Sequence, residues 1–312
     1  MSLISTIICT HNPNPRYLAQ TIEALKQQTL PTSAWELIVV DNNSQPKLTD
    51  EWVTWHPQGR IVTESRLGLA YARFRGIEAA AGDLLVFVDD DNLLAPDYLD
   101  SAEKIFQTTP TLGVGGANHI KPQYEGTPPE WIDQYAHWLA ISKPNSTTTL
   151  STHPFDSAAM PYGAGIIIRK QFAEAYARKR DDKNASGQLG RTGDRLIGGE
   201  EYDMTIIAAH AGAIFGKFDA LRLTHIIPTR RFSIDYLQRL MHDSAYSGVK
   251  LELLWGQTFL GRGMFRHNRA VLYGLKWLAP LIHRNRQPHL TFFQSKISGM
   301  LLALEEGFSA NL

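Results

Sequence analysis

The first 120 residues alternate between short apolar runs and longer amphipathic segments, and this pattern constrains the fold more than any other feature. We expect strands at residues 3–10, 36–41, 59–63, 83–89 and 112–119. Helices are expected between them at residues 17–28, 47–54, 67–81 and 96–107. Strands that alternate with helices are typical of an α/β fold. The sequence therefore predicts a mostly parallel sheet flanked by helices.

Polar residues follow three of the predicted strands at their carboxyl ends. Thr10-His11-Asn12 ends the first strand, Asp41-Asn42-Asn43-Ser44 ends the second, and Asp89-Asp90-Asp91 ends the fourth. In a parallel sheet these ends meet at one edge, and ligands bind in the crevice beyond that edge. We therefore expect the three clusters to face one binding site.

The three adjacent carboxylates of Asp89-Asp90-Asp91 would repel one another if no positive group lay nearby. A divalent cation that carries a phosphorylated ligand is a natural partner, because hard cations prefer oxygen ligands. The alternative interpretation is a polar loop, in which Asp91 and Asn92 cap a helix that begins near Pro96. The two interpretations predict different neighbours for Asp91.

A second acidic group, Gly198-Gly199-Glu200-Glu201-Tyr202-Asp203, stands at the start of a predicted helix that ends near His210. Carboxylates at a helix N-terminus interact favourably with the helix dipole, so capping is one interpretation. A carboxylate that faces a pocket can instead act as a general base. Two separate acidic clusters, one for a metal and one for proton removal, suit transfer of a group from a phosphorylated donor to a hydroxyl.

A single histidine, His225, stands in an apolar segment just before the basic pair Arg230-Arg231. One interpretation is a hydrogen-bonded core residue, which is common for a histidine in such a segment. Its position before two arginines favours another interpretation. His225 would then be a metal ligand, and the guanidinium groups would contact phosphate oxygens.

Several segments, taken in order, resemble the family 2 glycosyltransferases, which have the Rossmann-like GT-A fold of nucleotide-diphospho-sugar transferases. The segments are residues 5–12, 35–44, 68–76, 89–91 and 199–204. They resemble the family's nucleotide loop, its second strand with a uridine-contacting Asp, its Gly-x-x-x-Ala-Arg-Asn-x-Gly helix, its DxD motif and its base-carrying Gly-Glu-Asp-x-Asp-Leu segment. The resemblance covers roughly residues 3–235. It departs at Phe74, where the family usually has Asn, and at Glu201, where it commonly has Asp.

The resemblance implies an inverting transferase that moves a hexosyl or N-acetylhexosaminyl group from a nucleotide sugar, usually a UDP-sugar, to a hydroxyl of a glycan or a lipid-linked acceptor. Its donor-binding residues would be Thr10, Asn12, Asp41, Gly68, Arg73, Asp89, Asp90 and Arg231, with Arg230 as the alternative to Arg231. Asp91 and His225 would hold Mn²⁺ or Mg²⁺. Glu201 would be the general base, with Glu200 as the alternative.

Two other functions fit parts of this pattern. A sugar nucleotidyltransferase shares the sheet architecture, but it usually carries a Gly-rich, basic loop after the first strand. Thr10-His11-Asn12-Pro13 is not such a loop. A catalytically silent binding scaffold would keep the fold without the chemistry. Carboxylates at every expected position argue against the scaffold.

The resemblance also predicts how the chain is divided. A catalytic domain is expected at residues 1–235, with a nucleotide-binding half at 1–120 and an acceptor-binding half at 121–235. The second half contains Trp131 and Trp138, for which stacking on an acceptor sugar and core packing are both open. Residues 236–312 are expected to form a helical C-terminal extension that matches no motif.

This extension interleaves aromatic and basic residues. From Lys250 onward the chain has eight Lys and Arg residues against three Asp and Glu residues. Such a mixture suits helices that lie on an anionic bilayer surface. The alternative is a helical layer that packs against the catalytic domain or against a second subunit.

Composition limits the remaining choices. The formal net charge is zero, so the chain as a whole gives no case for nucleic-acid binding. The single cysteine, Cys9, cannot form an intramolecular disulfide and fits a reducing compartment. We find neither a signal peptide nor an apolar run that approaches the ~20 residues of a membrane span. We therefore expect a cytoplasmic protein, with peripheral contact to the inner membrane face or an oligomer contact through residues 250–312.

Overall fold

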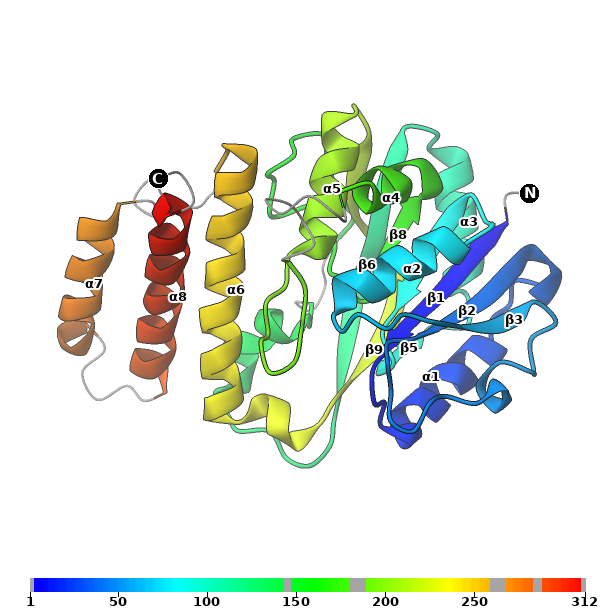
Figure 1. The fold of residues 1–312 in the computed structure, drawn as a ribbon, viewed down its shortest axis with the longest axis horizontal. Coiled ribbons are helices and arrows are strands. Elements are labelled where there is room, and N and C mark those ends of the chain that lie inside the picture. Colours follow the sequence, from blue (N-terminus) through cyan, green and yellow to red (C-terminus); the bar gives the residue numbers. More distant parts are fainter. Residues whose placement is uncertain (1–2, 143–146, 180–188, 259–267, 283–287, 310–312) are drawn as a thin grey trace.

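The computed structural model describes residues 3–142, 147–179, 189–258, 268–282 and 288–309. Over these residues, one sheet of nine strands runs through the protein, and helices cover both of its faces (Figure 1). The strand order is β3-β2-β1-β4-β8-β6-β9-β5, and β7 also pairs with β9. The predicted α/β class, with a helical C-terminal extension, is confirmed.

The first four strands of this order form the parallel part of the sheet. They are β1 (Ile4–Thr10), β2 (Trp35–Asp41), β3 (Gly59–Thr63) and β4 (Leu84–Val88). In the register of β1 and β2, Thr10 lies opposite Asp41, and β4 runs parallel to β1 on its other side. The carboxyl ends of these strands therefore share one edge, as their sequence predicts.

The rest of the sheet is mixed. The short strand β8 (Ile167–Arg169) runs antiparallel between β4 and β6 (Leu112–Tyr124). Strand β6 is longer than predicted and pairs in parallel with β9 (Ile214–Ile227). Strands β5 (Asn92–Leu94) and β7 (Thr149–Ser151) pair antiparallel with β9. The strand predicted at residues 112–119 is therefore separated from β4 by a strand from later in the chain.

Four of the predicted helices are present: α1 (Pro15–Lys26), α2 (Leu69–Ala79), α3 (Tyr98–Thr108) and α5 (Glu200–His210). Helix α4 (Lys170–Ala177) is not among the predicted ones. The helix expected at residues 47–54 is wrong, because only the 3-10 turn Asp50–Trp52 forms there. The Asp41 carboxylate accepts hydrogen bonds from the backbone N–H groups of Ser44 and Leu48, at 2.8 and 3.1 Å, and holds this segment as a loop.

Two hydrophobic cores, one on each face of the sheet, hold the helices in place. Alternate residues of β1 point to opposite faces, so Ile7 enters the first core and Ile8 enters the second. The first core also contains Phe74 of α2, and the second contains Leu18 of α1. All three apolar residues Ile7, Ile8 and Phe74 are fully buried.

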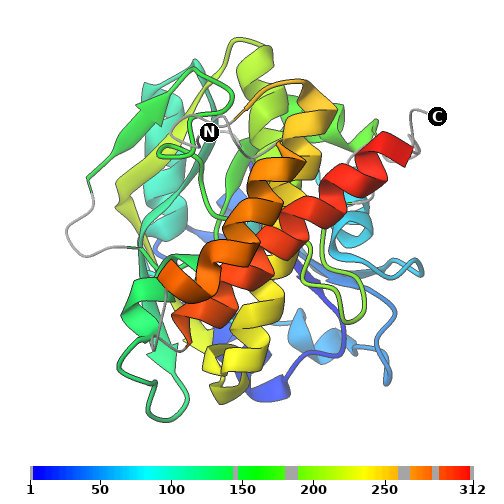
Figure 2. The ribbon, with the colours of Figure 1, turned by 90° about the vertical axis from the view of Figure 1, so that its left-hand side faces the viewer.

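The C-terminal extension forms a helical layer on one side of the molecule (Figure 2). Its helices are α6 (Ile234–Trp255), α7 (Arg269–Ile282) and α8 (His289–Ser309). Val249 of α6 belongs to the first core and Phe292 of α8 belongs to the second. The layer is therefore packed against the rest of the chain. Among the described residues, every helix is too short or too polar to cross a bilayer.

Candidate active site

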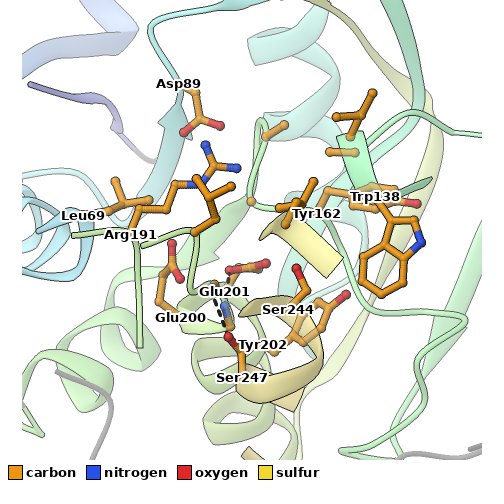
Figure 3. Close-up of a pocket in the computed structure, with 18 of the residues that line it drawn as sticks. Leu69, Asp89, Trp138, Tyr162, Arg191, Glu200, Glu201, Tyr202, Ser244 and Ser247 are labelled. Atoms are coloured by element: carbon orange, nitrogen blue, oxygen red, sulfur yellow. Dashed lines mark hydrogen bonds between the residues drawn. The ribbon is translucent and has the colours of Figure 1, made fainter. Parts of the chain in front are cut away.

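A cavity of about 1110 Å³ lies beyond the carboxyl ends of β1 and β4. Its walls come from the strand ends, residues 67–73, residues 137–140, residues 157–164, residues 191–202, and helices α6 and α8. In Figure 3, Asp89 and Arg191 lie on one side, Trp138 and Tyr162 lie on the other, and Glu200 and Glu201 come up from below. The cavity is where the sequence predicts a binding site.

The pairing of β5 with β9 brings Asp91 to His225. Asn92 lies opposite His225 in this register, so the residue before it, Asp91, is placed next to the imidazole. Asp91 Oδ1 is 3.5 Å from His225 Nε2, and Asp91 Oδ2 is 2.9 Å from Arg231 Nη2. Asn92 starts a strand and Asp97 precedes α3, so the interpretation of Asp91 and Asn92 as caps of that helix is wrong.

The hydrogen bonds of His225 define which ring nitrogen faces the site. Arg231 Nη1 is 2.9 Å from Nε2, and because a guanidinium only donates, Nε2 is the acceptor. Nδ1 therefore carries the proton and donates to the Leu139 carbonyl at 3.0 Å. A histidine held in this way by a backbone carbonyl presents the nitrogen that metal-binding histidines use.

The donor set suits a divalent cation that binds together with a ligand. Asp91 supplies a carboxylate and His225 supplies an imidazole nitrogen. Among the described residues, no group of three or more His, Cys, Asp or Glu side chains is placed to hold a metal ion. Cations that assist phosphate chemistry commonly bind through one or two protein carboxylates plus substrate phosphates. Asp91 and His225 would form that smaller kind of site only with Arg231 displaced, because its guanidinium is 2.9 Å from both His225 Nε2 and Asp91 Oδ2.

Two of the three carboxylates at the end of β4, Asp90 and Asp91, have opposite pKa shifts. Burial alone would raise the pKa of Asp91, but the Arg231 guanidinium holds it well below its ordinary value. Burial, reinforced by the Asp91 carboxylate, raises the pKa of Asp90 to about 7. The Thr10 hydroxyl donates a hydrogen bond to Asp90. Near neutral pH the pair therefore carries one firmly held negative charge on Asp91, while Asp90 is partly protonated.

Two of the predicted donor-binding residues do not line the cavity. Asp41 is 2% exposed and uses both carboxylate oxygens on its own loop. Asn12 is exposed, and its side-chain oxygen accepts a hydrogen bond from the Gln45 N–H at 2.8 Å. Asn42 does line the cavity. Its side chain accepts from the Gly68 N–H at 2.9 Å and donates to the Arg66 carbonyl at 2.6 Å, which fixes the loop before α2.

Gly68 and Arg73, both predicted from the α2 motif, lie in the cavity wall. Gly68 has a φ of 136°, and a Cβ there would come within 2.8 Å of Thr192 Oγ1, so no larger residue fits without strain. Arg73 is 2% exposed, and its Nη1 is 3.3 Å from Glu200 Oε1. Phe74, which departs from the family pattern, points into the first core instead of the cavity.

Glu200 and Glu201 begin α5 and have different surroundings. Glu200 is 3% exposed and forms the ion pair with Arg73. Glu201 is partly exposed to the cavity and accepts a hydrogen bond from the Gly199 N–H at 3.3 Å. Burial, reinforced by the Glu200 carboxylate, raises the pKa of Glu201 to about 7. Glu201 is therefore the member of the pair with the properties of a proton acceptor near neutral pH.

Helix α6 forms a cavity wall that the sequence does not predict. Its Ser247 hydroxyl accepts a hydrogen bond from the Gly198 N–H at 3.2 Å, and its Asp243 carboxylate accepts one from the Leu196 N–H at 2.6 Å. These bonds hold the segment that leads into Glu200 and Glu201. The signal in the sequence is weak, because a serine and an aspartate inside a helical pattern are ordinary surface residues.

Arg191 is a second residue that the sequence does not single out. It lines the cavity on the side of Asp89 (Figure 3), and its carbonyl accepts a hydrogen bond from the Leu69 N–H at 2.9 Å. Its positive charge also contributes to the low pKa of Asp91, after the larger effect of Arg231. Arg191 stands in a polar segment without a motif, so only the folded chain shows its position.

The two tryptophans of the second half separate into the two roles left open above. Trp131 contacts the rings of Tyr135 and Phe292, with centroids 6.1 and 5.7 Å apart, and packs between the extension and the rest of the chain. Trp138 lines the cavity, and Lys296 Nζ of α8 lies 5.7 Å from its ring centroid. An aromatic surface for a ligand is therefore available at Trp138.

Comparison with known proteins gives these results. Residues 5–176 match the family described as glycosyl transferase family 2. The glucosyl-dolichyl phosphate glucuronosyltransferase of Haloferax volcanii is 24% identical over an alignment of 315 positions, which covers 98% of this chain and 94% of that protein. Polypeptide N-acetylgalactosaminyltransferase 10 of Rattus norvegicus is 24% identical over an alignment of 237 positions, which covers 71% of this chain and 37% of that protein.

A solved structure shares the fold. The mannosyltransferase of Pyrobaculum calidifontis, in complex with GDP-Man and Mn²⁺, aligns with a TM-score of 0.60 at 16% identity. The alignment covers 100% of this chain and 88% of that chain, so the likeness extends over the helical C-terminal extension.

Proposed function

The chain belongs to glycosyl transferase family 2, and we propose that it is an inverting, metal-assisted enzyme that transfers a sugar from a UDP-sugar to a hydroxyl. That it is a glycosyltransferase follows from the family match and from relatives of that activity. The proposal concerns the donor, the metal, the base and the acceptor.

One observation carries the proposal. The same cavity holds a low-pKa carboxylate, Asp91, beside His225 and Arg231, and a high-pKa carboxylate, Glu201. The first group suits a diphosphate and its cation, because it offers an anionic ligand next to a fixed positive charge. The second suits removal of a proton from an acceptor hydroxyl near neutral pH.

The reaction would proceed by direct displacement. Glu201 takes the proton of the acceptor hydroxyl while the hydroxyl oxygen forms a bond to the anomeric carbon of the donor sugar. The bond from that carbon to the diphosphate breaks, and the diphosphate leaves with the electron pair. Attack from the side opposite the leaving group inverts the configuration. Arg231, which pairs with Asp91, and Arg191 would contact the departing phosphates, and Arg73, which pairs with Glu200, would keep Glu200 from competing as the base.

Asp91 and His225 would hold Mn²⁺ or Mg²⁺. Such a cation, when bound, supplies Lewis-acid stabilisation of the charge on the departing diphosphate. Asp89 would contact the ribose, and Asp90, with Thr10, would line the donor pocket beside it. Asp41 and Asn12 would act through the loops that they hold, because their side chains are engaged there.

The names of two relatives support the general classes of donor and acceptor that we propose. One curated relative is named for a glucosyl-dolichyl phosphate acceptor, and the solved neighbour is named for GDP-Man. We propose a UDP-sugar of the hexosyl or N-acetylhexosaminyl class and a glycan or lipid-linked acceptor. A cytoplasmic enzyme at the inner face of the membrane would meet a lipid-linked acceptor there.

A donor panel tests these choices. Purified full-length protein is incubated with UDP- and GDP-sugars and Mn²⁺, and release of the nucleoside diphosphate is measured. We expect release from a UDP-sugar, its loss on addition of EDTA, and its loss in Asp91→Asn. Asp219→Asn, an exposed aspartate on β9 outside the cavity, is the matched control and should behave as wild type. Turnover that EDTA leaves unchanged would rule out the metal, and release from GDP-sugars alone would rule out UDP.

A further inference from the structure

We infer that helix α7 lies on an anionic lipid surface and holds the protein there through Tyr273, Lys276 and Trp277. Contact of this kind is independent of which sugar the cavity binds. It would place the cavity next to a membrane.

Helix α7 is the outermost element of the helical layer and packs against α8 (Figure 2). Leu272 and Ala279 are 2% and 0% exposed and face the layer. Tyr273 and Trp277, one turn apart, are 49% and 76% exposed. Among the large apolar side chains of the described residues, Trp277 is the most exposed. The inner face of α7 is buried against the layer, and its outer face exposes aromatic rings. An exposed aromatic face of this kind marks a contact surface for a partner.

The charge around this helix identifies the kind of partner. Residues 256–289 contain six Lys and Arg residues and no Asp or Glu, although the whole chain has a formal net charge of zero. Lys276 stands next to Trp277 on the outer side of α7. The carboxylate of Glu305, from α8, faces this helix and is engaged by Arg269 at 3.4 Å and by the Tyr273 hydroxyl at 3.0 Å. Because Arg269 and Tyr273 engage this carboxylate, the exposed Lys276 gives the outer side of α7 a positive charge.

Aromatic and cationic side chains together favour an anionic bilayer over other partners. Tryptophan and tyrosine place an apolar ring and a polar tip at the headgroup level, and lysine extends its ammonium group to the phosphates. Each Lys or Arg near an anionic surface adds about 1 kcal/mol of attraction. A second copy of this chain is a poorer partner, because a two-fold contact through α7 would bring two equally cationic surfaces together.

Vesicle flotation tests the inference on the full chain. We expect flotation with vesicles of phosphatidylcholine and about one third phosphatidylglycerol, weaker flotation at high salt, and little with phosphatidylcholine alone. Trp277→Ser should lower the partition coefficient about tenfold, since it removes a large apolar group from the interface. Lys276→Glu should lower it at least about fivefold. Leu150→Ser, at an apolar residue 48% exposed on β7, is the matched control and should float as wild type.

The rate of nucleotide release without vesicles tests the proposed chemistry separately from membrane binding. Trp277→Ser should leave this rate unchanged. Equal flotation of wild type and Trp277→Ser would overturn the inference, as would equal binding to neutral and anionic vesicles. A wild-type dimer that Trp277→Ser dissociates, without vesicle binding, would assign the surface to a second copy and also overturn it.

Discussion

The strand-end wall of the cavity and its helical wall hold their functional groups in different ways. At the strand ends, the register of β5 with β9 places Asp91 against His225 and Arg231, and these side chains line the cavity. At the helical wall, Ser247 and Asp243 of α6 use their oxygens to hold the backbone of residues 196–199. The first wall offers charge, and the second fixes the position of the segment that carries Glu201.

Substitutions in the strand-end wall should therefore change the reaction step itself. Substitutions in the helical wall should change the position of the segment that carries Glu201. A group that meets the reacting atoms affects the rate by orders of magnitude, because it acts in the transition state. A group that holds a backbone segment affects the rate through the precision of that segment, and its own hydrogen bond contributes about 1 kcal/mol. The predictions below follow this ranking.

The largest effect is expected at the start of α5. Glu201→Gln removes the proposed base while keeping the size of the side chain, and we expect a loss of about 10³-fold in kcat. The dissociation constant for UDP should remain within about twofold, because Glu201 is not placed to contact the diphosphate. Transfer rate and calorimetric UDP binding measure the two quantities.

The matched control is Glu200→Gln, one residue away. Its carboxylate is 3.3 Å from Arg73, so the substitution should weaken an ion pair and lower stability more than it lowers the rate of the reaction step. If Glu200→Gln abolished transfer and Glu201→Gln did not, the base would be Glu200 and the division of roles between the two residues would be wrong.

Stability should depend strongly on the buried pair beneath the cavity. Arg73→Met removes the partner of Glu200, whose side chain is 4% exposed, and leaves a buried carboxylate without a compensating charge. Breaking such a pair costs about 3–5 kcal/mol of unfolding free energy. Denaturant unfolding measures this loss. The double substitution Arg73→Met with Glu200→Gln should recover part of it, and no recovery would show that packing of the Arg73 stem is the main effect.

The residues that sequence alone identified belong mainly to the strand-end wall. Strands β1, β2 and β4 are buried apolar runs, and the polar residues that end them are recognisable because polarity there is unusual. The sequence predicted that Asp91 and His225 share a metal ion, but it did not predict the strand pairing that brings them together. This antiparallel pairing involves β5, which is three residues long and too short to give a periodic signal.

The helical wall and the loop after β2 show what the sequence could not supply. Residues 47–54 have a helical pattern, but only the 3-10 turn Asp50–Trp52 forms, in a segment that follows a loop tied to the Asp41 carboxylate through the N–H groups of Ser44 and Leu48. Ser247 and Lys296 face the cavity because α6 and α8 pack onto the sheet, and their own neighbours in the sequence carry no motif. Tertiary packing determines the positions of these residues, and the local sequence pattern carries no information about that packing.

A pH profile can separate catalysis from stability. Burial and the Glu200 carboxylate raise the pKa of Glu201 to about 7, so transfer should fall about tenfold for each pH unit below that value as the base is protonated. Stability should change in the opposite direction. Because the folded-state pKa is raised above the ordinary 4.5, the protonated form favours folding, and unfolding free energy should fall as pH rises from about 5 to 7.

Both effects should be smaller in Glu201→Gln, which does not titrate. Denaturant unfolding at several pH values, with wild type and this variant side by side, measures the stability change that Glu201 contributes. Asp90, whose pKa is also about 7, should account for part of the remaining slope. A transfer rate that stayed level between pH 5 and 7 would contradict the assignment of Glu201 as the base.

The smallest effect, and the sharpest test of the helical wall, is expected for Ser247→Ala. The hydroxyl accepts the Gly198 N–H at 3.2 Å and donates to the Asp243 carbonyl at 2.7 Å, so its loss should cost about 1 kcal/mol of stability. Gly199 donates to Glu201 and thereby lowers its pKa, and a loosened segment weakens that bond. The midpoint of the pH–rate profile should therefore move upward in Ser247→Ala. Ser298→Ala, whose hydroxyl bonds only within α8 at 2.9 Å, should show the ordinary midpoint. An unmoved midpoint in Ser247→Ala would mean that α6 closes the cavity without positioning the base.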